Sequence, residues 1–452
     1  MQLKTFSKVF FLLFACIFLL GTVFAVDFAH AIGIDNEYDI KRFLVIGFVW
    51  FSSLGLCFVK HVEFIRFSTV TKLMCMIFFT LAIISALINQ HLFWGMVEIA
   101  NIVLLITVFL LFTTCIRALE SETVHFGVYV SALLFSVFTL VKYILFLIFS
   151  YLDAQNFDIH GLISGYVNVR FFNQLQVMII PMLFLPFFKQ NLAKFRTGTF
   201  IVIALHWMVL LQTEARGGML SLILAVTLLS CFLCKENRRS FIYPLLQTML
   251  VGICLWIVFI IIIPYWLMDS ANFQIRTSSS GRIDLWLYVL TSIPDSLWLG
   301  FGPMSFAWAE GKPLLNAHPH NAIVQLLYEY GVITCILGSA WVFSRMYNRL
   351  NILKQAKNIS IMPIVYAVLS GLIYSLFSGV AVMPFAQLLF VFLLVIQIQD
   401  GSRNINQVAV SVRVMLFLSV TLISCFFLCS YKHLELNTAL FPRIWVNGLL
   451  SR

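Results

Sequence analysis

The chain has 452 residues, of which 61% are hydrophobic and only 11% are charged. A soluble chain of this size cannot bury so much apolar surface, so the composition excludes a soluble globular protein and places most residues in a lipid bilayer. The net charge of +10 does not indicate a nucleic-acid partner, because the lysines and arginines stand in short clusters between apolar runs, as they do in membrane proteins.

Thirteen apolar segments are long enough to cross a bilayer, and each is predicted to be a helix, because a helix satisfies its own backbone hydrogen bonds in lipid. We therefore predict an all-α polytopic membrane protein with about 12–13 transmembrane helices in one integral membrane domain, residues 1–452. The segments are 9–26, 43–59, 73–89, 98–116, 126–150, 171–188, 197–213, 217–234, 243–268, 321–343, 362–380, 382–398 and 412–430.

The distribution of lysine and arginine favours an inside N-terminus, because the loops and ends that this topology puts inside carry more of these residues. The first segment is longer than the apolar core of an ordinary signal peptide, so we interpret it as a retained anchor helix. The side of the C-terminus stays open.

Two loops on the outside are long, residues 151–170 and residues 269–320. Within the second loop, the stretch from Arg282 to Ile293 has the spacing of an amphipathic helix that lies at the membrane surface. One face of that helix carries Ile283, Trp286, Leu287 and Leu290.

Four arginines are predicted at this same outer surface. Arg170 stands with Asn173 and Gln174 where the sixth segment begins, and Arg216 lies two residues after Glu214 in a tight turn. The second long loop supplies Arg276 and Arg282. Arginine binds phosphate through two parallel hydrogen bonds, so an anionic headgroup is a physical hypothesis for this surface. The alternatives are arginines that only reach lipid phosphates, and a structural pair between Glu214 and Arg216.

The sequence AHPHNAIVQLLYEYG, residues 317–331, opens the tenth segment with His318 and His320. Asn321, which is suited to cap a helix, recurs with Gln325 and Glu329 every four residues, so the three form one stripe that faces the bundle or a wet cavity. A neutral histidine at the top of such a stripe can accept a proton near neutral pH. The alternative is a histidine that only caps the helix. No metal is predicted, because the two histidines have no obvious further ligands.

Three sequence features together resemble the bacterial O-antigen ligase superfamily, which includes O-antigen polymerases and protein O-oligosaccharyltransferases. RGGML at 216–220 is similar to the arginine–leucine signature of that superfamily. HNAIVQLLYEYGVIT at 320–334 is similar to its His-Asn, glycine and threonine signature, and residues 281–306 resemble the loop that precedes the histidine. The resemblance covers about residues 165–340, the ligase-like core.

The resemblance implies a GT-C glycosyltransferase of the bacterial inner membrane with its active site facing the periplasm. Such an enzyme moves an oligosaccharide or O-antigen from undecaprenyl diphosphate to an acceptor hydroxyl. By the resemblance, His320 is the general base, and Arg216 and Arg282 bind the diphosphate. Charge and placement add Arg170 and Arg276 to the diphosphate site. Supporting roles are assigned to His318, Asn321, Gln325 and Glu214.

The expected reaction inverts the anomeric configuration and needs neither metal nor cofactor, because paired arginines supply positive charge to the leaving diphosphate. The acceptor is a lipid A–core sugar or a serine or threonine of a pilin. One alternative is an O-antigen polymerase of the same superfamily. A different class, a transporter or flippase for the lipid-linked glycan, would place polar groups through the whole membrane depth, whereas here they gather at one face.

Overall fold

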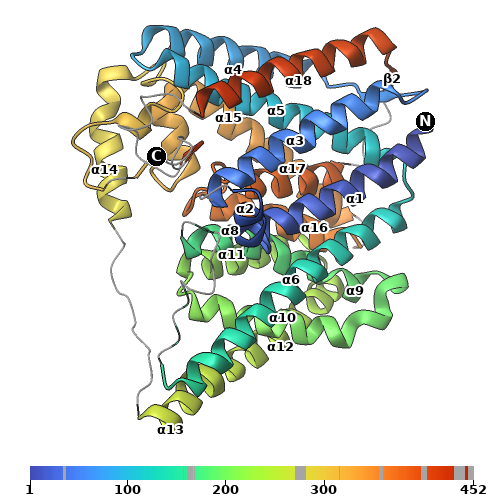
Figure 1. Cartoon of the computed structure of the whole chain (residues 1–452), viewed down its shortest axis with the longest axis vertical. Helices are drawn as coiled ribbons and strands as arrows, with labels where there is room; N and C mark the ends of the chain where they lie inside the picture. Colours follow the sequence, from blue (N-terminus) through green and yellow to red (C-terminus); the bar gives the residue numbers. More distant parts are fainter. Residues whose placement is uncertain are drawn as a thin grey trace.

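A computed structural model of the chain shows a bundle of long helices (Figure 1). It describes residues 1–33, 37–155, 157, 159, 166, 168–269, 281–314, 316–355, 360–398, 405–431 and 443–445. The α-helices are α1 (Leu3–Thr22), α2 (Ala25–Ala31), α3 (Glu37–Cys57), α4 (Thr69–Ile88), α5 (Leu92–Arg117), α6 (Ser121–Leu152), α8 (Val169–Leu183), α9 (Leu185–Phe188), α10 (Arg196–Gln212), α11 (Arg216–Phe232), α12 (Lys235–Trp256), α13 (Ile263–Met268), α14 (Arg282–Ser292), α15 (Ala322–Gln355), α16 (Met362–Tyr374), α17 (Pro384–Ile398) and α18 (Val410–Ser430).

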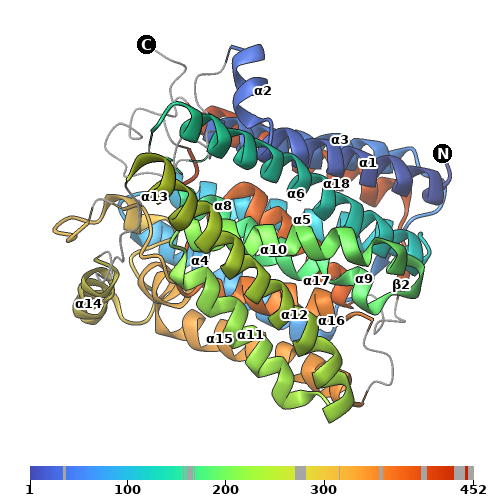
Figure 2. The ribbon, with the colours of Figure 1, turned by 90° about the horizontal axis from the view of Figure 1, so that it is seen from below.

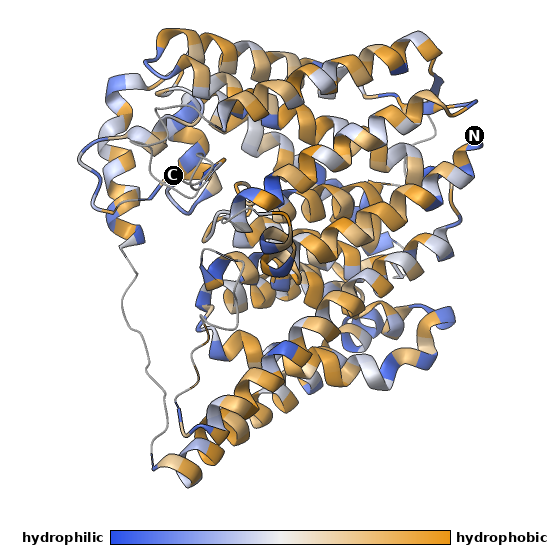
Figure 3. Cartoon of the chain, in the orientation of Figure 1, coloured by the Kyte–Doolittle hydropathy of each residue, from blue (hydrophilic) through white to orange (hydrophobic). Residues whose placement is uncertain are grey.

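The all-α polytopic membrane fold is confirmed. Within the described ranges, ten helical spans are long and apolar enough to cross a membrane, and three shorter apolar helices, α11, α16 and α17, accompany them. Each of the thirteen predicted segments overlaps one of these helices. Figure 3 shows apolar residues along the helix shafts and polar residues gathered in loops and at helix ends, as a bilayer requires.

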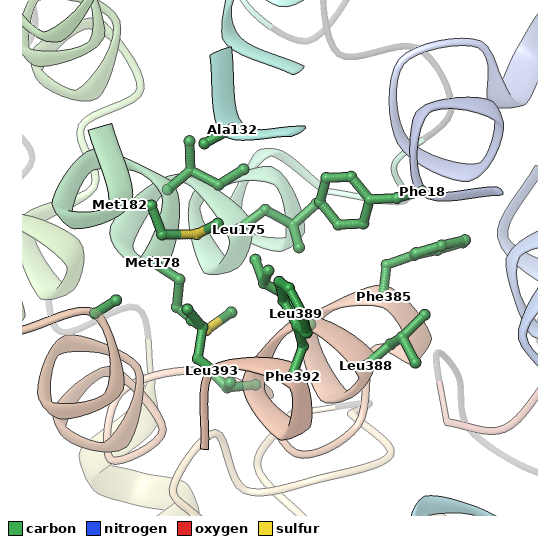
Figure 4. Packing of buried hydrophobic residues seen from close by; sticks show 14 of the residues in the cluster. Phe18, Ala132, Leu175, Met178, Met182, Phe385, Leu388, Leu389, Phe392 and Leu393 are labelled. Carbon is green, nitrogen blue, oxygen red and sulfur yellow. The ribbon is translucent and has the colours of Figure 1, made fainter. Parts of the chain in front are cut away.

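Helix α8 forms the centre of the bundle and is buried along almost its whole length. It contacts α16 and α6, and Figure 4 shows Leu175 and Met178 of α8 facing Leu389 and Leu393 of α17. Because α8 has protein on every side, its amides Asn173, Gln174 and Gln176 are buried and hydrogen-bonded within the bundle. This central helix begins at Val169, next to the predicted site residue Arg170.

The bundle has two distinct ends. The N-terminal amine of Met1 donates a hydrogen bond of 3.1 Å to the Phe58 carbonyl, close to the antiparallel strands β1 (Glu63–Ile65) and β2 (Ile405–Gln407). Figures 1 and 2 both place the N-terminus and β2 at one end and α14 at the other. The two strands lie between predicted transmembrane segments, in stretches for which no helix is predicted. We call the opposite end the α14 end.

Helix α14 begins at the predicted Arg282 and stands at the margin of the bundle (Figure 1). Three of the four predicted face residues are about half exposed, namely Ile283, Leu287 and Leu290. Trp286 departs from the prediction, because its indole is partly buried and donates a hydrogen bond of 2.9 Å to the Pro319 carbonyl. On the other side of the helix, Leu285 and Val289 are buried. The helix therefore packs on the protein with one side and presents an apolar strip with the other.

Helix α15 is broken, whereas the segment predicted at 321–343 assumed one continuous helix. Gly331 has φ +76° and ψ 176°, which splits α15 into a first half, residues 322–330, and a longer second half. A Cβ atom at this position would collide with the Trp298 carbonyl, and its φ disfavours any L side chain, so the break requires glycine.

The loop after α14 fills the break in α15. The Phe301 N–H donates to the Tyr328 carbonyl at 2.8 Å, and the Gly302 N–H donates to the Glu329 carbonyl at 3.1 Å. These bonds satisfy backbone carbonyls that the interrupted helix leaves open, which is necessary at membrane depth. The first half of α15 is consequently tied to the α14 loop.

Candidate active site

Arg170 lies in the first turn of α8 and is partly exposed. Gln174 follows one turn later, and its amide donates a hydrogen bond of 3.0 Å to the Ser378 hydroxyl. Asn173 is also fully buried and hydrogen-bonded. The two amides thus fasten α8 within the core, and Arg170 is the member of this motif that reaches the surface of the α14 end.

The turn between α10 and α11 is as tight as the sequence predicts. Glu214 has a positive φ of 49°, and its carbonyl accepts the Arg216 N–H at 2.8 Å. Side chains approach Gly217 closely, because a Cβ atom there would lie 3.0 Å from Phe377 Cβ and 3.4 Å from Tyr374 Cε2. The approaching chain is the connection between α16 and α17.

Arg282 is the first residue of α14 and follows Gly281, whose φ is +68°. Burial lowers the pKa of the Arg282 guanidinium, and the positive charges of Arg170 and Arg216 lower it further. Its Nε is buried without a hydrogen-bond partner among the described residues. Arg282 of α14 therefore lies within electrostatic reach of Arg170 of α8 and Arg216 of α11, and an anion beside it would relieve the repulsion.

His318 and His320 flank the buried Pro319 at the entrance to α15. The backbone N–H of His320 donates to Nδ1 of His318 at 3.2 Å, and the ring centroids are 4.3 Å apart. His320 has a positive φ of 56°, an unusual conformation that a non-glycine residue keeps only where its surroundings fix it. His318 is 2% exposed, whereas His320 is only partly buried. The pair thus consists of an inner histidine and one nearer the surface.

Both histidines are held in the neutral form. Burial lowers the pKa of His320 to about 3, and the positive charges of Arg282 and then Arg170 contribute to that shift. Burial also lowers the pKa of His318, with contributions from His320, Arg443 and Arg282. Arg282 and Arg170 therefore act on His320, whereas Arg216 acts on Arg282. Arg282 connects the group, because it lies within electrostatic reach of Arg170, Arg216, His318 and His320.

Residues 199–338 match the O-antigen ligase family. This match places residues 199–338 in the O-antigen ligase superfamily. No curated protein matches the sequence of the chain. The matched range contains Arg216, Arg282 and His320, and it ends beyond Gly331, whereas Arg170 precedes it. The match supports a glycosyltransferase-type enzyme that acts on lipid-linked glycans in a membrane, without distinguishing a ligase from a polymerase.

Close contacts between the loop after α14 and α15 explain why glycines stand at these positions. Gly300 has φ +70°, and a Cβ atom there would lie 2.6 Å from the Tyr328 carbonyl oxygen. Gly300 and Gly302 let the loop run against the broken α15, where Gly331 receives it. These glycines allow the contact between the loop and α15, the helix that follows His320.

The stripe below His320 faces the bundle, as the spacing predicts. Asn321 caps the helix, because its side-chain oxygen accepts the backbone N–H groups of Ile323 and Val324 at 2.9 and 3.1 Å. Gln325 donates to the Glu329 carboxylate at 3.2 Å, and Glu329 is completely buried.

The cation that neutralises Glu329 in this ligase-superfamily bundle was not predicted. Arg443, which is 2% exposed, places its guanidinium 2.8 Å from Glu329 and 3.3 Å from Glu98. The Tyr38 hydroxyl donates to the Arg443 carbonyl at 2.8 Å. Two carboxylates inside apolar segments were the available signal, because each needs a buried positive partner. These contacts put residue 443 at the α14 end, where the predicted topology had left the C-terminal side open.

The two remaining predictions concern Arg276 and metal binding. Arg276 lies outside the described residues, so its assignment stays a prediction. Over the described ranges, no group of three or more His, Cys, Asp or Glu side chains is placed to hold a metal ion. Cys231 and Cys234, which form a CxxC sequence, are free and exposed.

Proposed function

We propose that the protein transfers an oligosaccharide or O-antigen from undecaprenyl diphosphate to an acceptor hydroxyl at the periplasmic face of the inner membrane. The observation that carries the proposal is the position of Arg282, which lies within electrostatic reach of His320, Arg170 and Arg216. Membership of the O-antigen ligase superfamily supports the reaction class and the lipid-linked donor.

In this proposal the guanidiniums hold the diphosphate of the donor. Guanidinium and phosphate form paired, charge-assisted hydrogen bonds, each contributing about 1.5–3 kcal/mol. The repulsion among the positive charges around Arg282 falls when two or more negative charges lie between the arginines.

His320 would act as general base. Its imidazole is neutral, so a ring nitrogen can accept the proton of the acceptor hydroxyl while that oxygen bonds to the anomeric carbon. The bond from the anomeric carbon to the diphosphate oxygen breaks, and the diphosphate leaves with the electron pair, stabilised by the arginines. One displacement at the anomeric carbon inverts its configuration. His318, Asn321, Gln325 and Glu214 support this arrangement from the turns around it.

Binding of the donor would also make His320 a stronger base. Burial holds its pKa low, and the charges of Arg282 and then Arg170 lower it further. A diphosphate would offset those charges and raise the pKa towards the usual histidine value of about 6.5. Proton acceptance would then be coupled to the presence of the donor.

The acceptor is a lipid A–core sugar or a serine or threonine of a pilin, and an O-antigen polymerase uses the same parts. A transporter or flippase is the competing class. We favour the enzyme, because the arginines and histidines gather at the α14 end and act on one another.

A transfer assay with purified full-length protein tests the proposal. An undecaprenyl diphosphate-linked oligosaccharide is mixed with core lipid, with pilin or with a second copy of the donor, in the presence of a chelator. We expect the wild type to transfer glycan to one of the three. His320→Ala should stay folded and lose transfer by several orders of magnitude, whereas Arg216→Ala should bind the donor more weakly.

Matched controls separate the roles from general damage. His30 is an exposed histidine of α2, and Arg239 is an exposed arginine of α12, so alanine at either position should leave transfer unchanged. Full activity of His320→Ala would remove its role as base. A folded wild type that transfers glycan to no acceptor, but moves the lipid-linked glycan across a bilayer, would favour the transporter.

A further inference from the structure

The connection between α16 and α17, residues 375–383, contacts several elements of the candidate active site. The carbonyl of Ser375 accepts the backbone N–H of Ala322 at 2.9 Å, immediately after His320 and Asn321. A Cβ atom on Gly379 would lie 2.6 Å from the His318 ring. This connection lies outside residues 199–338, so family membership gives it no role.

The same connection reaches the helices that carry two of the arginines. Ser378 accepts a hydrogen bond of 3.0 Å from Gln174, which is one helical turn after Arg170. The ring of Tyr374, the last residue of α16, packs against Gly217, next to Arg216. Tyr374 thus stands where α8, α11 and the entrance to α15 meet.

The hydroxyl of Tyr374 points into the charged part of this region. It is hydrogen-bonded to Ser378, and it lies within electrostatic reach of Arg282 and Arg170. The side chain is only 3% exposed, so its position is fixed by packing. A hydroxyl is both donor and acceptor, and its hydrogen turns freely towards the better partner.

We propose that the Tyr374 hydroxyl is a further binding contact for the diphosphate of the donor, beside Arg170, Arg216 and Arg282. This inference rests on the proposed function and deepens it. A neutral donor adds a hydrogen bond to a phosphoryl oxygen without adding repulsion to three neighbouring cations. A phosphoryl oxygen that enters beside Arg282 can accept the hydrogen of this hydroxyl.

The chain offers a matched control on the same helix. Tyr366 is also buried in α16, two turns earlier, and its hydroxyl has no hydrogen-bond partner within the described part of the chain. Tyr374→Phe and Tyr366→Phe each remove one oxygen from a packed ring, so their effects on folding should be small and similar. Ser378→Ala removes the partner of the Tyr374 hydroxyl and leaves that hydroxyl in place.

Binding of undecaprenyl diphosphate to the purified full chain is measured by calorimetry, and transfer kinetics are measured with the lipid-linked oligosaccharide. Losing one charge-assisted hydrogen bond should weaken binding of the Tyr374→Phe protein by about ten- to hundredfold. Its KM should rise correspondingly, and Tyr366→Phe and Ser378→Ala should bind like the wild type.

Equal binding and equal KM in Tyr374→Phe and the wild type would overturn the inference. So would an equal loss in Ser378→Ala, because the hydroxyl would then act only through Ser378. A wild type that binds undecaprenyl diphosphate but transfers no glycan would refute the proposed function, and the binding comparison would still decide the role of Tyr374. A wild type that does not bind the probe would overturn both.

Discussion

Replacing Arg443 with methionine tests whether the buried charges at the α14 end depend on the C-terminal segment. Arg443 is 2% exposed and lies 2.8 Å from Glu329 and 3.3 Å from Glu98. Methionine is an apolar side chain of similar length, so Arg443→Met removes the charge and keeps much of the volume. Two carboxylates would remain buried without this cation.

The expected cost follows from the burial of the pair. Removing one partner of a buried ion pair destabilises a protein by about 3–5 kcal/mol, because the other charge stays desolvated. Arg42 also lies within electrostatic reach of Glu98 and offsets part of the loss. We therefore expect about 3 kcal/mol, a large fraction of a typical total of about 5–15 kcal/mol.

The free energy of unfolding is measured by denaturant titration in mixed micelles and compared with the melting temperature in detergent. The informative partner variant combines Arg443→Met with Glu98→Gln and Glu329→Gln, which removes all three charges and should recover most of the loss. Arg239→Met, on an exposed surface, is the control for losing one positive charge. Unchanged stability of Arg443→Met, or a triple variant no more stable than the single one, would refute the reasoning.

Two further predictions concern the pKa of His320 and the break in α15, the helix that follows it. The charge of Arg282 helps to lower the pKa of His320, so Arg282→Gln should raise that pKa. The low-pH limb of the kcat/KM profile should then move to higher pH, whether or not the maximum value of kcat/KM also changes. A limb that stays in place or moves to lower pH would contradict this. Gly331→Ala should reduce both stability and transfer, because a Cβ there meets the Trp298 carbonyl, whereas Gly127→Ala, with open space around it, should change neither. Equal melting temperatures of the two alanine variants would show that the break tolerates a side chain.

The helices were predictable because lipid imposes a strong and local rule. A chain in a bilayer must satisfy its backbone within each segment, so an apolar run of sufficient length indicates a helix. The break in α15 was not predictable from that rule, because Gly331 within an apolar run resembles any other glycine of a membrane helix. Its need becomes visible only when the Trp298 carbonyl occupies the space of the missing side chain.

The candidate site was predictable where the sequence carries motifs. His320 and Arg216 stand in short signatures, and the stripe from Asn321 to Glu329 follows from helical spacing. Arg443 and Tyr374 have no such context, because their meaning comes from partners far away in the chain. Trp286 shows the same limit, since its hydrogen bond to Pro319 turns it away from the predicted face.

The first half of α15 is a short, straight segment that connects His320 to the loop after α14. About nine residues at 1.5 Å each give it a length of about 13 Å. His320 lies just before its N-terminal end, and its C-terminal end is hydrogen-bonded to the loop that follows α14. Since α14 carries an apolar strip on its exposed side, the surroundings of that strip are connected to His320 through the α14 loop and the first half of α15.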